Sequence, residues 1–234
     1  KLEEAEISHR KAIELNPNFS GAYCNLGNVL SDLGKLQEAF SSYLKSMEIN
    51  PILPNIYESI NNLLKDADPS KLNTSKLKNI LNILLKRNDI YHQNLFKAFN
   101  FLFSNEIITN LEKLDSDSSK IKSLVNDEII INALKKIVFH DPKLEKVLIK
   151  SRRNICHRIA KNIEYINCSE LQFIIALGEQ CFLNEYVYSF TEEENMCLNT
   201  IIERCRYGQL SEINISILSC YYPLYKLLDQ IPSL

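Results

Sequence analysis

The sequence predicts an all-α protein in which helical hairpins, repeated as a right-handed solenoid, precede a helical bundle-like domain. Three observations lead to this prediction. Residues 1–17 align with residues 35–51, so that Lys1 matches Lys35 and Pro17 matches Pro51. From residue 74 onward, apolar side chains recur at helical spacing, as in Leu77, Ile80 and Leu84. No segment shows the apolar–polar alternation between turn residues that indicates a β-hairpin.

The repeat is carried by two matching segments, "KLEEAEISHRKAIELNP" and "KLQEAFSSYLKSMEINP". Their period and the intervening "NFSGAYCNLGNVLSDLG" resemble the tetratricopeptide repeat, a helix–turn–helix unit with a period of about 34 residues. One complete repeat covers residues 20–53. The residues at the signature positions of that family are Tyr23, Leu26, Gly27, Leu30, Ala39, Tyr43 and Pro51.

The small residues of this repeat have a physical purpose. Gly27 and Ala39 lie where the two helices of a hairpin must approach closely. Gly34 is expected to end the first helix, because glycine adopts a left-handed conformation that other residues resist. Pro51 closes the unit, since proline cannot continue a helix.

The repeats on either side of this unit are incomplete. Residues 1–16 are expected to form only the second helix of a preceding repeat. A third unit begins at residues 54–64, but Asn61 occupies the position of the small residue, and "DADPSKLNTS" interrupts the second helix. We therefore expect the repeats to occupy 1–66, a helical connector 67–124, and an all-α linker domain 125–234.

The resemblance also implies a binding groove. In this family the first helix of each hairpin lines a concave surface, and Asn25 resembles the asparagines that grip an extended peptide in some such repeats. A carboxamide suits this role because it both donates and accepts hydrogen bonds. Asn28 and Asp32 lie on the same side at helical spacing. The alternative, that all three are solvated surface residues, stays open.

Turn and capping signals divide the remainder into helices. Asn126 or Asp127 is expected to cap one helix, Asp141 followed by Pro142 opens the next, and Thr191 with Glu194 forms a capping box. Gly208 is expected to end the helix that this box begins. The predicted helices after residue 125 cover 126–140, 143–163, 169–188 and 191–207, with a last helix before Pro223.

Composition excludes several classes of function. The net charge of −2 gives no field that attracts nucleic acid, and no apolar run reaches the roughly 18 residues of a membrane span. The seven cysteines lack the spacing of a zinc site and suit reduced thiols in a cytoplasm. No glycine-rich phosphate loop occurs, so we expect no cofactor, no metal and no catalytic residue.

Three later segments together resemble one family: "VNDEIIINALKKIVFHDPKLEKVLIKSRRNI", "QCFLNEYVYSFTEEE" and "LSCYYPLYKL". They are similar to the linker of bacterial proteins in which tetratricopeptide repeats precede an S-adenosylmethionine-dependent methyltransferase domain. Because the sequence begins inside a helical pattern without methionine, we expect a fragment of a longer protein. The resemblance implies a non-catalytic scaffold that binds a protein or peptide, with the catalytic domain following in cis. A glycosyltransferase or a sulfotransferase as that domain is the alternative.

The stretch 180–194 allows a second interpretation, because Cys181 with His157 or His140 has the residue types of a cysteine hydrolase. Against it, Cys181 lies among apolar residues of a predicted helix, and buried thiols are unreactive. On that helix Glu185 is expected to face the core. A buried carboxylate requires a partner, so we expect a polar network of Asn184 and Glu185 with Arg153, Arg158 or Arg204, completed by Tyr186 or Tyr188.

Overall fold

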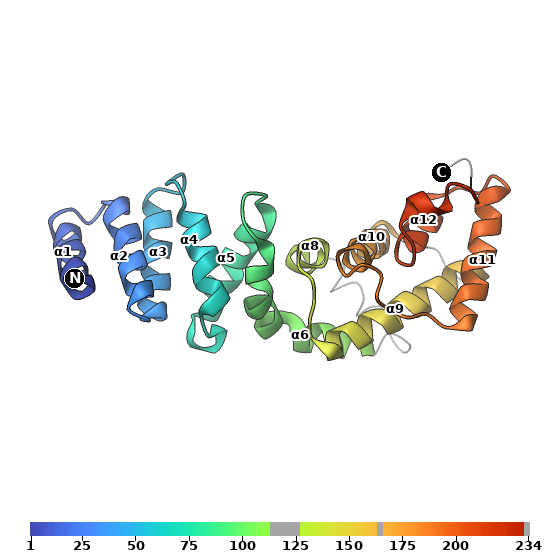
Figure 1. Ribbon diagram of the computed structural model, residues 1–234, viewed down its shortest axis with the longest axis horizontal. Helices are drawn as coiled ribbons and strands as arrows, with labels where there is room; N and C mark the ends of the chain where they lie inside the picture. The colour runs from blue at the N-terminus through green and yellow to red at the C-terminus, as the bar shows by residue number, and fades with distance from the viewer. Residues whose placement is uncertain (113–126, 163–165, 232–234) are drawn as a thin grey trace. The chain divides into compact units, whose positions relative to one another are not determined.

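The computed structural model describes residues 1–112, 127–162 and 166–231. Every regular element within these ranges is a helix, which confirms the all-α class. The chain forms two compact units, Lys1–Leu102 and Phe103–Leu234, which we call the repeat unit and the C-terminal unit (Figure 1). The predicted division into three parts stays a prediction, and its boundary at 124–125 lies outside the described residues.

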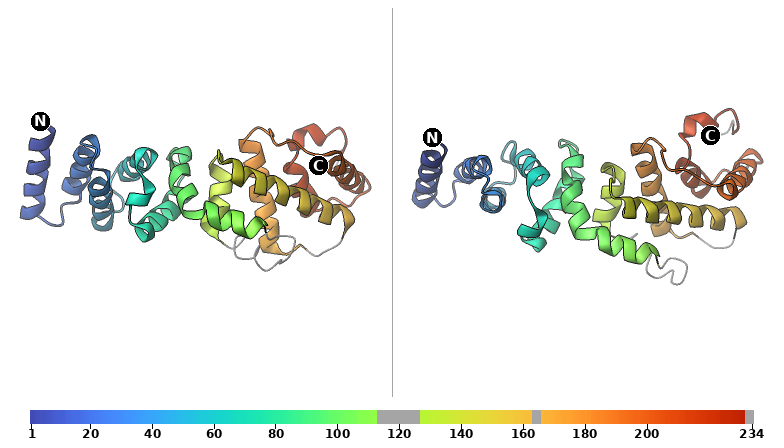
Figure 2. Two further views of the ribbon diagram at one scale, coloured as in Figure 1. Left: turned by 90° about the horizontal axis from the view of Figure 1, so that it is seen from below. Right: turned by 60° about the horizontal axis from the view of Figure 1, so that its bottom comes forward.

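The repeat unit is a row of antiparallel helices. Its neighbours along the chain pack side by side, α1 against α2, α2 against α3 and α3 against α4 (Figures 1 and 2). This packing is that of a helical-repeat solenoid. The elements are α1 (Leu2–Leu15), α2 (Ser20–Asp32), α3 (Leu36–Ile49), α4 (Ile56–Asp66), η1 (Pro69–Lys71), α5 (Thr74–Lys86), η2 (His92–Leu95) and α6 (Phe96–Glu112), the last of which continues into the C-terminal unit.

A close contact between α2 and α3 explains the glycine of the repeat. A Cβ atom on Gly27 would lie 2.5 Å from Cε1 of Tyr43, a distance that no side chain tolerates. The tyrosine ring thus packs directly on the glycine backbone. Gly34 ends α2 in the left-handed conformation, with φ of 72°, as the sequence predicted.

The third unit departs from the repeat pattern at Asn61. This residue stands one repeat period after Gly27, is buried, and donates a hydrogen bond from Nδ2 to the carbonyl oxygen of Tyr91 at 3.1 Å. Gly27 has no side chain, which leaves room for the Tyr43 ring on the backbone of α2. Asn61 has a side chain at the equivalent position of α4, and this side chain fills the corresponding space. Helix α4 packs against both α3 and the short η2 helix, and the Asn61 bond helps to hold η2.

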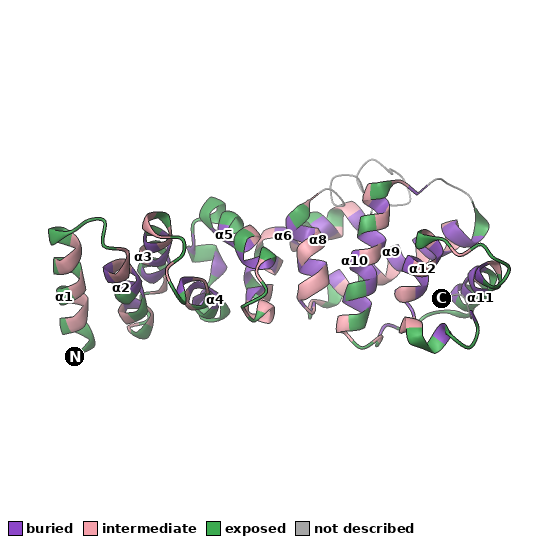
Figure 3. Ribbon diagram, turned by 90° about the horizontal axis from the view of Figure 1, so that it is seen from above, coloured by how far each residue is buried: buried purple, intermediate pink, exposed green. Residues whose placement is uncertain are grey.

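The C-terminal unit is a bundle of helices of different lengths. Helix α10 packs against α8 and α12, while α9 packs against α11 and α12 (Figure 1). The buried faces of these helices point toward one another (Figure 3). The elements are α8 (Glu128–Lys136), α9 (Pro142–Lys161), α10 (Cys168–Leu183), α11 (Glu192–Arg206), α12 (Glu212–Ser219) and η3 (Leu224–Leu227).

Local capping signals locate the starts of these helices. Asp127 accepts the backbone N–H of Ile129 and caps α8, whereas Asn126 lies outside the described residues. Asp141 caps α9, with Pro142 at its first position. Thr191 and Glu194 form the expected reciprocal capping box at the start of α11. These interactions join near neighbours in the chain, so a single sequence is enough to predict them.

The end of α10 differs from the prediction. The helix stops at Leu183 rather than continuing to residue 188. Two consecutive non-glycine residues, Glu185 and Tyr186, then have a φ of 58°. The N–H of Glu185 bonds to the carbonyl oxygen of Phe182 at 3.0 Å, and the N–H of Tyr186 bonds to that of Cys181 at 2.9 Å. This is a Schellman motif with a glutamate where glycine is preferred, and it turns Glu185 out into solvent.

Glu185 is therefore a strained position. We expect Glu185→Gly to raise the free energy of unfolding by about 0.5–1 kcal/mol, because glycine adopts positive φ without a steric penalty. Urea unfolding followed by circular dichroism measures this change. As a matched control, Gly208→Ala at the equivalent position of α11, with φ of 89°, should lower the stability by about 1 kcal/mol. A less stable Glu185→Gly variant would contradict the assignment.

Candidate functional site

The candidate site of the repeat unit begins on the solvent side of α2. Asn25, Asn28 and Asp32 are all exposed there and follow one another at about one helical turn. Of the other residues of the repeat signature, Leu26, Leu30, Ala39 and Tyr43 are buried, whereas Tyr23 is half-buried and Pro51 is exposed. The three polar residues thus lie opposite the buried side of α2.

Tyr43 connects this polar side to the neighbouring helices. Its ring is buried on α3, and its hydroxyl donates a hydrogen bond to Oδ1 of Asn28 at 2.8 Å. Burial raises the pKa of Tyr43 to about 12, with Cys24 and Asp32 adding to the shift. Ser59 of α4 acts in the opposite direction and lowers this pKa. The tyrosine therefore fixes the orientation of the Asn28 amide.

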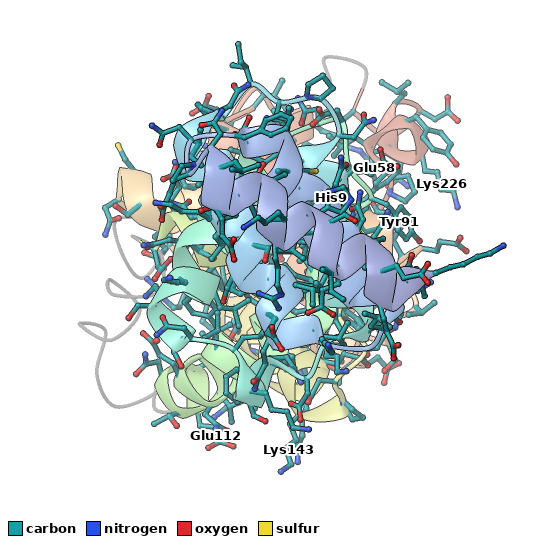
Figure 4. All side chains as sticks on the ribbon, turned by 90° about the vertical axis from the view of Figure 1, so that its left-hand side faces the viewer. His9, Glu58, Tyr91, Glu112, Lys143 and Lys226 are labelled. Carbon is teal, nitrogen blue, oxygen red and sulfur yellow. The ribbon has the colours of Figure 1, made fainter. Side chains whose placement is uncertain are left out.

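The polar surface continues onto α4 and η2. Asn94 on η2 donates from Nδ2 to Oδ1 of Asn62 on α4 at 3.4 Å. Figure 4, which looks from the α1 end, shows Glu58 and Tyr91 on the same side of the repeat unit. Glu58 precedes Asn62 by one turn of α4. We call Asn25, Asn28, Asn62 and Asn94 the amide row.

Two residues of the amide row, Asn62 and Asn94, were not among those predicted from the sequence. Asn62 follows Asn28 by one full repeat period, so the period itself was the signal that could have identified it. Asn94 follows Asn62 by slightly less than a period, after the interruption at η1, so the period no longer locates it. Its place beside α4 depends on the packing of η2.

The fold and this surface define a helical-hairpin repeat protein. A family model described as the tetratricopeptide repeat matches residues 10–40, which contain α2 and parts of α1 and α3. The chain therefore carries a tetratricopeptide repeat, a module of protein–protein interaction scaffolds. A comparison with curated proteins gives no match.

A second cluster of polar residues lies inside the C-terminal unit. Its centre is Glu194, whose side chain has no exposed surface. The Tyr221 hydroxyl donates to Glu194 Oε1 at 2.7 Å, and the N–H of Thr191 donates to Oε2 at 2.8 Å. Arg152 Nη2 lies 3.5 Å from Oε1, and Arg153 Nε lies 3.2 Å from Oε2. We call Arg152, Arg153, Glu194 and Tyr221 the Glu194 cluster.

Arg152 is the buried cation of this cluster. Its guanidinium lies 4.1 Å from the centre of the Tyr221 ring and donates to the carbonyl oxygen of Ser189 at 2.8 Å. Burial alone raises the pKa of Glu194. The Thr191 N–H, the Tyr221 hydroxyl and the two arginines outweigh burial, so the pKa of Glu194 is lowered. Glu194 therefore stays ionised in the core.

The structure corrects the predicted network around Glu185. Glu185 is exposed and contributes no buried charge, because α10 ends before it. The buried carboxylate of the stretch 180–194 is instead its last residue, Glu194. Asn184 is half-buried, and neither its amide nor the buried Tyr188 hydroxyl has a hydrogen-bond partner among the described residues, so the predicted completion of the network by these two residues is not found.

The three candidate arginines have different partners. Arg153 contacts Glu194, and Arg158 Nη1 bonds to Oε1 of Glu170 at 2.6 Å. Arg204 donates to the carbonyl oxygen of Ile159 at 2.8 Å and so satisfies the end of α9. All three arginines therefore stabilise the fold of the C-terminal unit through groups other than Glu185.

Cys181 has the environment of a structural thiol. It is fully buried, and burial raises its pKa to about 11, so it is protonated near neutral pH.

Within the described ranges, no group of three or more His, Cys, Asp or Glu residues is placed to bind a metal ion. No helix in the described part of the chain is long and apolar enough to cross a membrane.

The Glu194 cluster predicts a large effect of a conservative substitution. Glu194→Gln removes the charge that faces Arg152, and we expect the free energy of unfolding to fall by about 3–5 kcal/mol at neutral pH, since a buried charge loses its partner. Glu185→Gln, at an exposed position, should change it by less than about 0.5 kcal/mol. Urea unfolding of both variants measures the difference, and equal effects would contradict the cluster.

The stability of the wild-type chain should depend on pH differently from that of Glu194→Gln. In the unfolded chain Glu194 binds its proton at the ordinary pKa of 4.5, above the lowered value of the folded chain. Its contribution to stability is therefore complete above pH 4.5 and is lost as the pH falls through the folded value. The wild-type chain should lose stability in this range more steeply than Glu194→Gln.

Proposed function

We propose that the repeat unit binds an extended peptide along the amide row, and that the chain acts as a non-catalytic scaffold. The observation that carries this proposal is the placement of Asn25 and Asn28 on α2, of Asn62 one repeat period later on α4, and of Asn94 on η2 with its amide bonded to Asn62. A peptide backbone presents alternating N–H and C=O groups, and each carboxamide can bind both.

The spacing of the row supports the proposal. Helices that pack side by side have axes about 8–10 Å apart. An extended peptide rises about 3.3 Å per residue. Amides on neighbouring elements would therefore meet backbone groups about three residues apart, and a peptide of roughly seven residues would reach from α2 to η2. Because the contacts are to the backbone, recognition by the row tolerates many side chains.

Selection of random heptapeptides displayed on phage against the full chain provides the ligand for a test. We expect Asn25→Ala to weaken binding of a selected peptide by about 3–10-fold, the effect of one or two neutral hydrogen bonds, with no change in the melting temperature. Asn28→Asp should also weaken binding. It keeps the acceptor for Tyr43 but removes the N–H donors. Fluorescence anisotropy with a labelled peptide measures both affinities.

Two controls make the result specific to the amide row. Asn79→Ala changes an exposed asparagine on α5, outside the row, and should leave the affinity unchanged. A peptide with methylated backbone nitrogens should bind more weakly to the wild-type chain. If no peptide is selected, or if Asn25→Ala and Asn79→Ala behave alike, the amide row does not bind peptide.

We further propose that the C-terminal unit is a linker associated with an S-adenosylmethionine-dependent methyltransferase domain in the same polypeptide. The proposal rests on the resemblance of three segments, and each segment contributes to the Glu194 cluster: the first supplies Arg152 and Arg153, the second Glu194, and the third Tyr221. The resemblance therefore lies in the residues that build the core of this unit. No residue of this chain is assigned to methyl transfer.

The reading frame beyond the codon of Leu234 tests this association. We expect it to encode a strand followed by a glycine-rich Gly-x-Gly turn. In this arrangement a backbone loop and the N-terminus of a helix bind a nucleotide-type cofactor. A glycosyltransferase or sulfotransferase domain in that frame would support the alternative and refute the methyltransferase proposal. A frame that encodes no further domain would refute both.

A further inference from the structure

A groove lies between α10, α12 and η3 of the C-terminal unit. Its volume is about 490 Å³, and its lining includes Phe182, Tyr186, Tyr225, Glu179, Ile175 and Ile215. The two helices that flank it pack against each other (Figure 3). A Cβ atom on Gly178 would lie 2.4 Å from Oγ of Ser219, so the backbones of α10 and α12 approach closely at the base of the groove.

Aromatic rings form the walls of this groove and remain open to solvent. Phe182 is 62% exposed and Tyr225 is 69% exposed. The rings of Phe182 and Tyr186 lie edge to face, with centroids 6.5 Å apart and planes at 79°. Two rings at nearly right angles present adjacent walls, an arrangement that suits a ligand group able to contact both.

The position of Tyr186 is fixed by an unfavourable backbone. It follows Glu185 in the left-handed region, and the bond from its N–H to the carbonyl oxygen of Cys181 holds it against the end of α10. Strained residues of this kind are concentrated at binding and active sites, where they place a side chain. Here the strain places the Tyr186 ring beside Phe182.

The charge of the groove is negative. Glu179 is exposed in its lining, and no lysine, arginine or histidine is among the described residues that line it. Glu179 and Tyr225 lie close enough to Tyr186 to contribute to the raised pKa of its hydroxyl, of which burial is the main cause. One carboxylate beside three aromatic rings is complementary to an organic cation, which aromatic faces attract.

We propose that this groove binds an arginine side chain of a partner polypeptide. The guanidinium would stack on the aromatic walls and pair with the Glu179 carboxylate, while apolar neighbours of the arginine would contact Ile175 and Ile215. Arginine fits better than a compact ammonium because its planar group can stack and form two parallel hydrogen bonds at once. This site is separate from the amide row and does not depend on it.

The full chain labelled with 3-fluorotyrosine tests the proposal by ¹⁹F NMR, with Tyr186→Phe and Tyr225→Phe used to assign the two resonances. The ligand is the peptide acetyl-Leu-Arg-Leu-amide. We expect both resonances to shift on titration. The citrulline peptide, which has the same shape without the charge, should bind at least about fivefold more weakly, as expected for loss of a charge-assisted hydrogen bond.

Variants locate the binding site. Glu179→Gln should weaken binding of the arginine peptide by about 10-fold and remove most of its dependence on salt. Glu192→Gln, an exposed glutamate on α11 outside the groove, should bind as the wild-type chain does. Equal affinity for arginine and citrulline peptides, an unchanged affinity in Glu179→Gln, or no shift of either resonance would overturn the proposal. Because Asn25 and Asn28 are in the other unit, their variants should not affect these titrations.

Discussion

A carboxylate removed from water, Glu194, organises the C-terminal unit. A buried charge is stable only if ion pairing and hydrogen bonds replace its hydration. Glu194 obtains these from Thr191 at the start of its own helix, from Arg152 and Arg153 on α9, and from Tyr221 after α12. Helix α9, the start of α11 and the segment after α12 must therefore meet at one point. The burial of this one carboxylate thus joins α9, α11 and the segment after α12.

The repeat unit depends on a steric constraint rather than on charge. Gly27 lets the ring of Tyr43 rest on the backbone of α2, and the tyrosine hydroxyl then reaches the amide of Asn28 on the solvent side. The same contact closes the hairpin and orients a residue of the candidate binding surface. At α4, where Asn61 stands in the position of the glycine, η2 packs against the helix in addition to α3 and contributes Asn94 to the amide row. The loss of the repeat therefore extends the proposed surface.

The two proposed surfaces use different chemistry. The amide row offers hydrogen bonds that suit any extended backbone, whereas the groove between α10 and η3 offers aromatic rings and a carboxylate that suit one cationic side chain. A scaffold with both could bind a flexible segment with low sequence selectivity and a second, arginine-containing segment with higher selectivity. Both surfaces stand on helices whose opposite sides are buried, so a rigid core supports them.

The sequence by itself determined the helices and most of their ends. The repeat period, Gly34, Gly208, Asp141 with Pro142, and the Thr191–Glu194 capping box act over a few neighbouring residues or through a repeated pattern, and they need no knowledge of the fold. The end of α10 was missed because Glu185 adopts a conformation that favours glycine, and α8 ends at Lys136 rather than at the predicted residue 140. Only the tertiary structure decided which carboxylate is buried, because Arg152 and Tyr221 reach Glu194 from other elements of the bundle. The tertiary structure also decided that Asn94 joins the amide row. Such contacts depend on how helices pack, and helical periodicity specifies a buried side without specifying what it faces.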